Sequence, residues 1–255
     1  MYLFKIDKQF TMTHLEQAVI GQLVSDNYRT AAVFSKYRID FCCNGNRTIE
    51  EACAQKKINL SAVTADLAEV LGVQPETGTD YNTWEPDVLA IHIVDRHHAY
   101  VANQIPVLQA YLHKLSNVHG GAHPELVRIA QLFNESAAEL TMHMKKEELV
   151  LFPYIRQMVV ARENGTSAAP AHFGTVAGPI SMMMHEHDQE GERFRQIQQL
   201  SGDYTVPPDG CNTYRVTYSL LKEFQEDLHL HIHLENNILF PKAADLENGF
   251  RAGGK

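Results

Sequence analysis

The sequence HMKKEELVLFP, from His143 to Pro153, returns 88 residues later as HIHLENNILFP, from His231 to Pro241. The two stretches share the first histidine, the glutamate four residues after it and the final Leu-Phe-Pro. Residues four apart in an α-helix lie on one face about one turn from each other, so each stretch can direct an imidazole and a carboxylate toward one point. The repeat therefore predicts two related helices that each carry two candidate metal ligands.

Two single histidines extend this repeat. His98 and His187 lie 89 residues apart, each in the segment that precedes one of the repeated stretches. The pattern indicates two related helical hairpins, each of which supplies one single histidine and one His-x-x-x-Glu pair. The apolar seam of its helix includes His98 and leaves His97 outside it, and among the alternating histidines 229, 231 and 233 the seam and the repeat both select His231.

Four long segments carry the apolar period of amphipathic helices, and their connections contain Gly and Pro. Such segments with short connections predict an all-α fold, an up-down-up-down four-helix bundle. The segments cover roughly residues 86–115, 124–160, 179–200 and 212–246.

A smaller helical domain is expected before the bundle. Thr48 and Glu51 form the pattern of a capping box, and the adjacent Cys42 and Cys43 precede a turn-forming Asn-Gly-Asn. The stretch that follows is rich in Gly, Pro, Thr and acidic residues, which is typical of a linker. The sequence thus predicts a helical domain with a vicinal cysteine pair at residues 1–75, a linker at 76–85 and the bundle at 86–255.

Six polar side chains would be buried in this bundle, at a cost of several kcal/mol for each uncompensated charge, so a cation is expected among them. Four imidazoles and two carboxylates exceed the ligands of one tetrahedral zinc and include no thiolate. The set suits two iron or manganese ions with the carboxylates as bridges, and the excess of imidazole favours iron. The candidate ligands are His98, His143, Glu147, His187, His231 and Glu235.

Composition excludes several classes of partner and compartment. The formal net charge is -9, and no stretch is rich in Lys and Arg, which argues against nucleic acid or an anionic membrane surface as the main partner. No run of 18 apolar residues and no signal-peptide pattern occurs, and four cysteines in 255 residues do not form a secreted disulfide framework. We therefore expect a cytoplasmic protein.

A zinc-protease motif is excluded because Gln189 stands four residues after His185, where the motif needs its second histidine.

The chain resembles the repair-of-iron-centres family from about Thr13 to Leu246. Asp40-Phe41-Cys42-Cys43 followed by Gly45 is similar to the family's N-terminal module. The bundle segments resemble the family's hemerythrin-like di-iron domain. The motifs that carry this resemblance occur in the family's order: Arg96-His97-His98, the stretch from His143, Glu186-His187-Asp188 and the stretch from His231.

The resemblance implies a cytosolic stress protein that restores iron-sulfur clusters damaged by nitric oxide or oxidants. The family's iron ligands map onto the six residues selected above, and its paired cysteines map onto Cys42 and Cys43. The family usually has an aromatic residue before the first ligand, where this chain has His97. The seam favours His98 as the ligand.

Our hypothesis is that two iron ions, bridged by an oxo group and by Glu147 and Glu235, form a labile store that supplies iron to damaged iron-sulfur proteins. Those proteins would be transient partners, and an unidentified reductant would act with them, while Cys42 and Cys43 would accept electrons or nitric oxide. Whether the chain forms a homodimer is left open, and Cys53 and Cys211 carry no motif.

Two alternatives use the same irons. A hemerythrin-like carrier or sensor would bind dioxygen or nitric oxide reversibly, but hemerythrin has a second histidine one turn from its third-helix ligand. Here Met183 and Gly191 flank His187 at that spacing, which leaves the site more open. An enzyme that reduces nitric oxide or oxidises a substrate at the irons is the other alternative.

Overall fold

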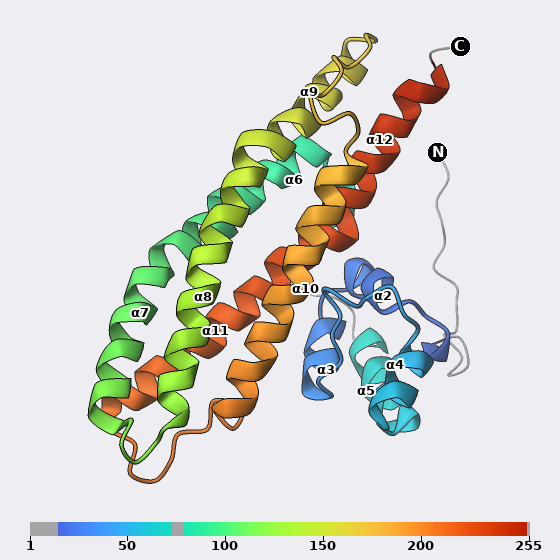
Figure 1. Ribbon diagram of the computed structural model, residues 1–255. Coiled ribbons are helices and arrows are strands. Elements are labelled where there is room, and N and C mark those ends of the chain that lie inside the picture. Colours follow the sequence, from blue (N-terminus) through green and yellow to red (C-terminus); the bar gives the residue numbers. More distant parts are fainter. Residues whose placement is uncertain (1–14, 73–78, 254–255) are drawn as a thin grey trace. The chain divides into compact units, whose positions relative to one another are not determined.

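The computed structural model describes residues 15–72 and 79–253 of the chain (Figure 1). Two compact units divide the chain, Met1–Thr83 and Trp84–Lys255. The division falls inside the predicted linker at 76–85, whose first residues lie outside the described part. Within the described residues, no helix has both the length and the apolar character needed to cross a membrane.

The smaller unit consists of short helices around an apolar centre that includes Ile20, Phe34 and Leu67. The predicted capping box is confirmed, because Thr48 Oγ1 accepts from the Glu51 backbone N–H and the Glu51 carboxylate accepts from the Thr48 N–H. The helices are α2 (Ile20–Asp26), α3 (Thr30–Lys36), α4 (Ile49–Lys56) and α5 (Leu60–Gly72), followed by the 3-10 turn η1 (Tyr81–Thr83).

The larger unit is a bundle of four long helical rods (Figure 1). The rods pack in a ring, since α7 lies against α8 and α11, and α10 lies against the same two helices. The predicted all-α, up-down-up-down bundle is confirmed. The first rod is α6 (Pro86–His92), η2 (Ile93–His98) and α7 (Ala99–His119); the second is α8 (Glu125–Lys146), η3 (Glu147–Leu151) and α9 (Phe152–Glu163); the third is α10 (Ala177–Leu200); the fourth is α11 (Asn212–Leu234), η4 (Glu235–Leu239) and α12 (Phe240–Gly253).

Three rods contain a π-helical segment, η2, η3 or η4. The segments η3 and η4 end two residues before Pro153 and Pro241, and a proline inside a helix favours a kink. Proline has no N–H, and its ring would clash with the carbonyl four residues earlier, so a wider turn before it relieves both problems. Single π-helical turns inside α-helices are frequent at functional sites.

The alternating 3 and 4 spacing of a bundle core predicts a seam along the fourth rod, and every position of this seam is buried: Thr217, Leu221, Phe224, Leu228, His231, Glu235 and Ile238. The same spacing predicts a seam from Ile91 to Leu108 in the first rod, but Ile91 is 46 % exposed. The π-helical turn η2 shifts the phase of that rod, so that the residues facing inward before it are Leu89 and Ala90. The placement of His97 outside the buried stripe was wrong for the same reason, since His97 is 1 % exposed.

Candidate metal centre

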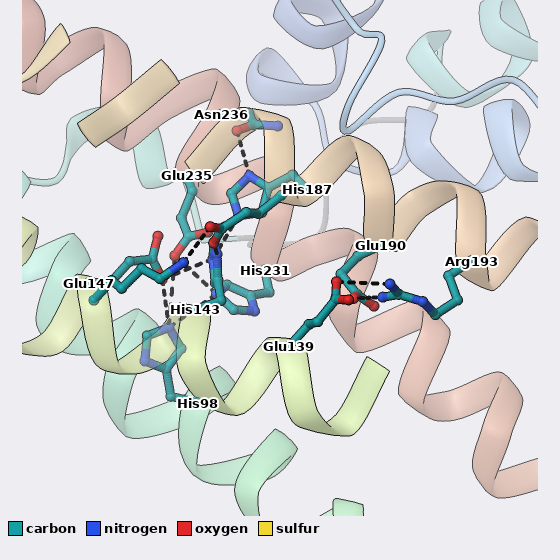
Figure 2. A network of polar contacts seen from close by, with 12 residues as sticks. His98, Glu139, His143, Glu147, His187, Glu190, Arg193, His231, Glu235 and Asn236 are labelled. Atoms are coloured by element: carbon teal, nitrogen blue, oxygen red, sulfur yellow. Dashed lines mark hydrogen bonds and ion pairs between the residues drawn. The ribbon is translucent and has the colours of Figure 1, made fainter. Parts of the chain in front are cut away.

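The six predicted side chains gather in one layer of the bundle interior (Figure 2). None is more than 3 % exposed, and both carboxylates are completely buried. All four rods contribute, with the glutamates at the first positions of η3 and η4. The residues are His98 at the end of η2, His143 on α8, Glu147 on η3, His187 on α10, His231 on α11 and Glu235 on η4.

Ligand atoms in this layer form two groups of four that share both carboxylates. Glu147 and Glu235 join His98 and His231 in one group, and they join His143 and His187 in the other. Within each group the candidate ligand atoms lie within 4.8 Å of one another. Two metal positions with the two glutamates in common therefore match the arrangement.

Within each group the two imidazoles turn the same nitrogen toward each other. The Nε2 atoms of His98 and His231 are 3.2 Å apart, and those of His143 and His187 are 3.0 Å apart. Only one hydrogen fits between two such nitrogens, and a cation bound by both satisfies both lone pairs.

The carboxylate of Glu235 spans the two groups. Its Oε1 lies 3.0 Å from His231 Nε2, and its Oε2 lies 3.1 Å from His187 Nε2. The carboxylate of Glu147 places Oε2 at 3.4 Å from His98 Nε2 and 3.3 Å from His143 Nε2. Both carboxylates thus lie between the two histidine pairs, as bridging ligands do.

Among the described residues, neither oxygen of Glu147 has a hydrogen-bond partner, and Glu235 Oε2 also has none. Buried carboxylate oxygens normally have partners, because leaving them unsatisfied is costly. Oxygen and imidazole donors without a thiolate are a set that binds iron. The residues therefore fit an iron site on their own geometry.

Charge balance in the layer also indicates cation binding. Burial by itself lowers the pKa of His98 and of His143, but the neighbouring carboxylates of Glu147 and Glu235 outweigh it and raise both to about 10. Burial by itself raises the pKa of Glu235, but His231, His187 and His98 hold it well below its usual value. The two carboxylates are thus compensated by positive charge, which protons or metal ions can supply.

Three of the four histidines donate their outer nitrogen to a fixed acceptor. His98 Nδ1 donates to Glu148 and His143 Nδ1 to Glu186, each at 2.8 Å. His187 Nδ1 donates to Asn236 Oδ1 at 2.8 Å. Such partners fix the orientation of the ring and raise its basicity. These three partners carry no motif of their own in the sequence; the one signal for them is that each lies directly before or after a predicted ligand.

Aromatic rings cover the outer sides of two of these imidazoles. His98 stacks on Phe152 with ring centroids 5.9 Å apart, and His187 stacks on Phe240 at 6.0 Å. Phe152 and Phe240 are equivalent in the sequence repeat, so the repeat is also a repeat of structure.

A further histidine is buried beyond the six. His233 is 1 % exposed and pairs with Asn237 on the same rod. Burial lowers its pKa to about 4. The selection of His231 alone among the alternating histidines was wrong about burial, because His233 is buried as well, without joining either ligand group.

Cys42 and Cys43 belong to the smaller unit. Their Sγ atoms lie 3.7 Å apart, without a disulfide, and the Asp40 carboxylate accepts from the backbone N–H of both residues. Asp40, Cys42 and Cys43 together form a third group of possible ligand atoms. The neighbouring Cys43 thiol, burial and Asp40 all raise the pKa of the Cys42 thiol.

Residues 89–243 match the hemerythrin HHE cation binding domain family, and residues 16–71 match a domain described as of unknown function, DUF542. Similar proteins are named iron-sulfur cluster repair protein YtfE. That of Dickeya chrysanthemi is 34 % identical over 230 residues, which is 90 % of this chain and 98 % of the relative. The Citrobacter koseri protein is 35 % identical over 224 residues, 88 % of this chain and 95 % of the relative. The Cronobacter sakazakii protein is 36 % identical over 230 residues, with the same coverage of 88 % and 95 %.

The buried layer of four histidines and two shared glutamates lies inside the region that matches a cation binding domain, and the relatives match along nearly their whole length. The chain therefore belongs to the hemerythrin-like iron-sulfur cluster repair family.

Proposed function

We propose that this protein repairs iron-sulfur clusters damaged by nitrosative or oxidative stress, and that it does so by supplying iron from a two-iron centre. The observation that carries the proposal is the pair of ligand groups that share Glu147 and Glu235. The names of the relatives point to the same activity. Damaged iron-sulfur proteins would be transient partners in the cytoplasm.

The six ligand residues and their outer partners would have separate roles in this centre. Glu147 and Glu235 would hold both metal positions, and two histidines would complete each position. When bound, iron supplies a centre whose ferrous form holds its ligands less strongly than the ferric form, so that reduction favours release. The chain holds the ligands in place through the outer partners Glu148, Glu186 and Asn236.

The cysteine pair of the smaller unit would take part in redox or nitric oxide chemistry. Its support is the 3.7 Å approach of the Cys42 and Cys43 thiols, which form no disulfide and are held by the Asp40 turn. An external reductant, not yet identified, would supply the electrons.

A cell-free repair assay tests the proposal. The full chain, loaded with ⁵⁷Fe, is added to an iron-sulfur enzyme that nitric oxide has inactivated, together with a reductant. We expect the enzyme to regain activity and to acquire ⁵⁷Fe in its cluster. The control is the Glu147→Gln/Glu235→Gln double variant, which lacks both bridging carboxylates and should restore nothing. Recovery without ⁵⁷Fe in the client cluster would contradict iron supply.

A second function, binding or reduction of nitric oxide at the irons, is favoured by one observation. Each group offers only two imidazoles and two shared carboxylates, and Met183 and Gly191 stand where a further histidine beside His187 would lie. Iron prefers more ligands than these, so small molecules can bind. Sustained consumption of nitric oxide with matching oxidation of a reductant, while both irons stay on the protein, would favour this function over repair.

A further inference from the structure

The sequence repeat makes two outer contacts of the metal centre equivalent. His98 Nδ1 donates to Glu148, and His187 Nδ1 donates to Asn236, both at 2.8 Å. Glu148 and Asn236 each follow a shared glutamate directly and are 88 residues apart. The single histidine of each hairpin therefore has an oxygen acceptor from the same place in the repeat.

The equivalence fails for the other pair of histidines. His143 Nδ1 donates to Glu186, which also pairs with Lys146. In the repeat, the residue equivalent to Glu186 is His97, since each directly precedes a single histidine. His97 gives His231 no acceptor; its ring stacks on that of His231, with centroids 5.7 Å apart and planes 10° from parallel. His231 Nδ1 is buried and has no hydrogen-bond partner among the described residues.

His97 is held away from His231 Nδ1 by its own hydrogen bond. His97 Nδ1 donates at 3.0 Å to Asp227 Oδ1, one helical turn before His231 on α11. The other polar atom of each side chain in this hydrogen bond, His97 Nε2 and Asp227 Oδ2, is buried and has no hydrogen-bond partner among the described residues. Buried polar atoms of this kind are usually satisfied by water. His231 therefore lacks the fixed acceptor that orients the ring of His143.

We propose that the metal position between His98 and His231 is the exchangeable one of the two, and that His97 makes it so by withholding an acceptor from His231. The inference rests on the two-iron function proposed above and specifies which iron is given up. Both positions share the same carboxylates, so the difference between them lies in the histidines and their outer partners. Loss of an outer partner of a metal-ligating histidine typically costs about 10- to 100-fold in metal affinity. His97 is thus a positioning residue that acts through His231.

Release kinetics test this assignment. The full chain with two ferrous ions is mixed anaerobically with an excess of a coloured ferrous chelator, and the absorbance is followed. We expect two phases of one iron each, with rates that differ by about tenfold or more. His97→Glu restores a carboxylate at the position equivalent to Glu186 and should slow the fast phase by about tenfold while leaving the slow phase unchanged. His97→Gln offers a neutral acceptor and should give a smaller slowing in the same phase.

Two isosteric variants at the other position serve as matched controls. Glu186→Gln weakens the acceptor of His143 and should accelerate only the slow phase. Asn236→Asp strengthens the acceptor of His187 and should retard only the slow phase. Protein that has lost its fast iron is then refilled with one equivalent of ⁵⁷Fe. Its Mössbauer spectrum should show one doublet. Relative to the unsubstituted protein, the parameters of this doublet should change more in His97→Glu than in Glu186→Gln.

The outcomes separate this inference from the function on which it rests. Fewer than two irons bound per chain would contradict the two-iron function itself. Two irons that leave in one phase would overturn the inference alone. A fast phase that is accelerated by Glu186→Gln would also overturn it, because the exchangeable iron would then lie between His143 and His187; this result can be read even if the His97 variants do not fold.

Discussion

Glu147 and Glu235 are both completely buried, and each places a carboxylate oxygen within 4.8 Å of the ring nitrogens of both histidine pairs. Neither metal position is complete without both carboxylates. Glu147→Gln should therefore weaken both positions, because the amide is neutral and a poor bridge. We expect iron content after reconstitution to fall from two per chain to one or fewer, with an altered Mössbauer spectrum for any iron that stays. One iron retained in an unaltered environment would show that Glu147 serves a single position.

The stability of the iron-free and iron-loaded forms should diverge with pH. In the iron-free chain His98 and His143 have a pKa of about 10, above the usual 6.5, so their contribution to the free energy of unfolding is complete below pH 6.5 and is lost as pH rises toward 10. Iron needs neutral imidazoles, so its binding strengthens over the same rise.

Thermal unfolding with and without a chelator, from about pH 5.5 to about pH 8.5, measures this difference. The gap between the two melting temperatures should widen as pH rises. The lower limit is set by Glu235, whose pKa lies well below its usual 4.5, so its contribution is present above pH 4.5 and falls only in more acid solution. A gap that stays constant or narrows would mean that these histidines do not exchange protons for metal.

A second buried charge network supports the bundle one turn from the metal layer (Figure 2). The Glu190 carboxylate is 3 % exposed, pairs with Arg193 and accepts from Ser136 Oγ at 2.5 Å. Arg193 also pairs with Glu139 at 2.8 Å. Arg193→Met leaves the Glu190 charge buried without its main partner and should destabilise the bundle by about 3 kcal/mol, measured by denaturant unfolding.

The control for that network is the double variant Arg193→Met/Glu190→Leu. Replacing both partners by apolar residues removes the unpaired charge, so most of the lost free energy of unfolding should return. Because burial raises the pKa of Glu190, the loss in the single variant should also shrink as pH falls. If the single and double variants lose the same free energy of unfolding, the packing of the aliphatic parts of Arg193 and Glu190 matters more than their ion pair.

The cysteines should differ in their rates of alkylation. The backbone N–H of Tyr214 and the His119 ring lower the pKa of the exposed Cys211 thiol to about 7, whereas burial raises that of Cys53. Cys42 is also buried, and its pKa is raised well above the usual value. Because the thiolate is the nucleophile, iodoacetamide near neutral pH should modify Cys211 first, as mass spectrometry of peptides can show.

Unfolding in urea provides the control for this order. Once the chain is unfolded, the cysteines should react at similar rates. If Cys42 reacts as fast as Cys211 in the folded protein, the turn around Asp40 does not protect the Cys42 thiol. The proposed redox or nitric oxide role of the buried Cys42 would then need revision.

The bundle and the position of the six side chains could be predicted because both depend on local spacing. The fourth rod shows this best, since its seam from Thr217 to Ile238 follows a regular helical period and is buried throughout. The 88-residue repeat added a second constraint that no single motif provides.

The first rod could not be predicted in the same way. A π-helical turn at η2 adds a residue to one turn and shifts the phase, so Ile91 turns to solvent and His97 turns inward. Sequence period alone cannot reveal such a turn when no proline follows it closely. The partners of the outer nitrogens, such as Asp227 for His97, lie on other rods and are fixed only by tertiary packing.

Anomalous diffraction from crystals of the iron-loaded protein, recorded on both sides of the iron absorption edge, tests the two-iron centre most directly. We expect two iron peaks, one between His98 and His231 and one between His143 and His187, each in contact with both Glu147 and Glu235. A single peak, or peaks that do not share these two carboxylates, would contradict the two-iron centre.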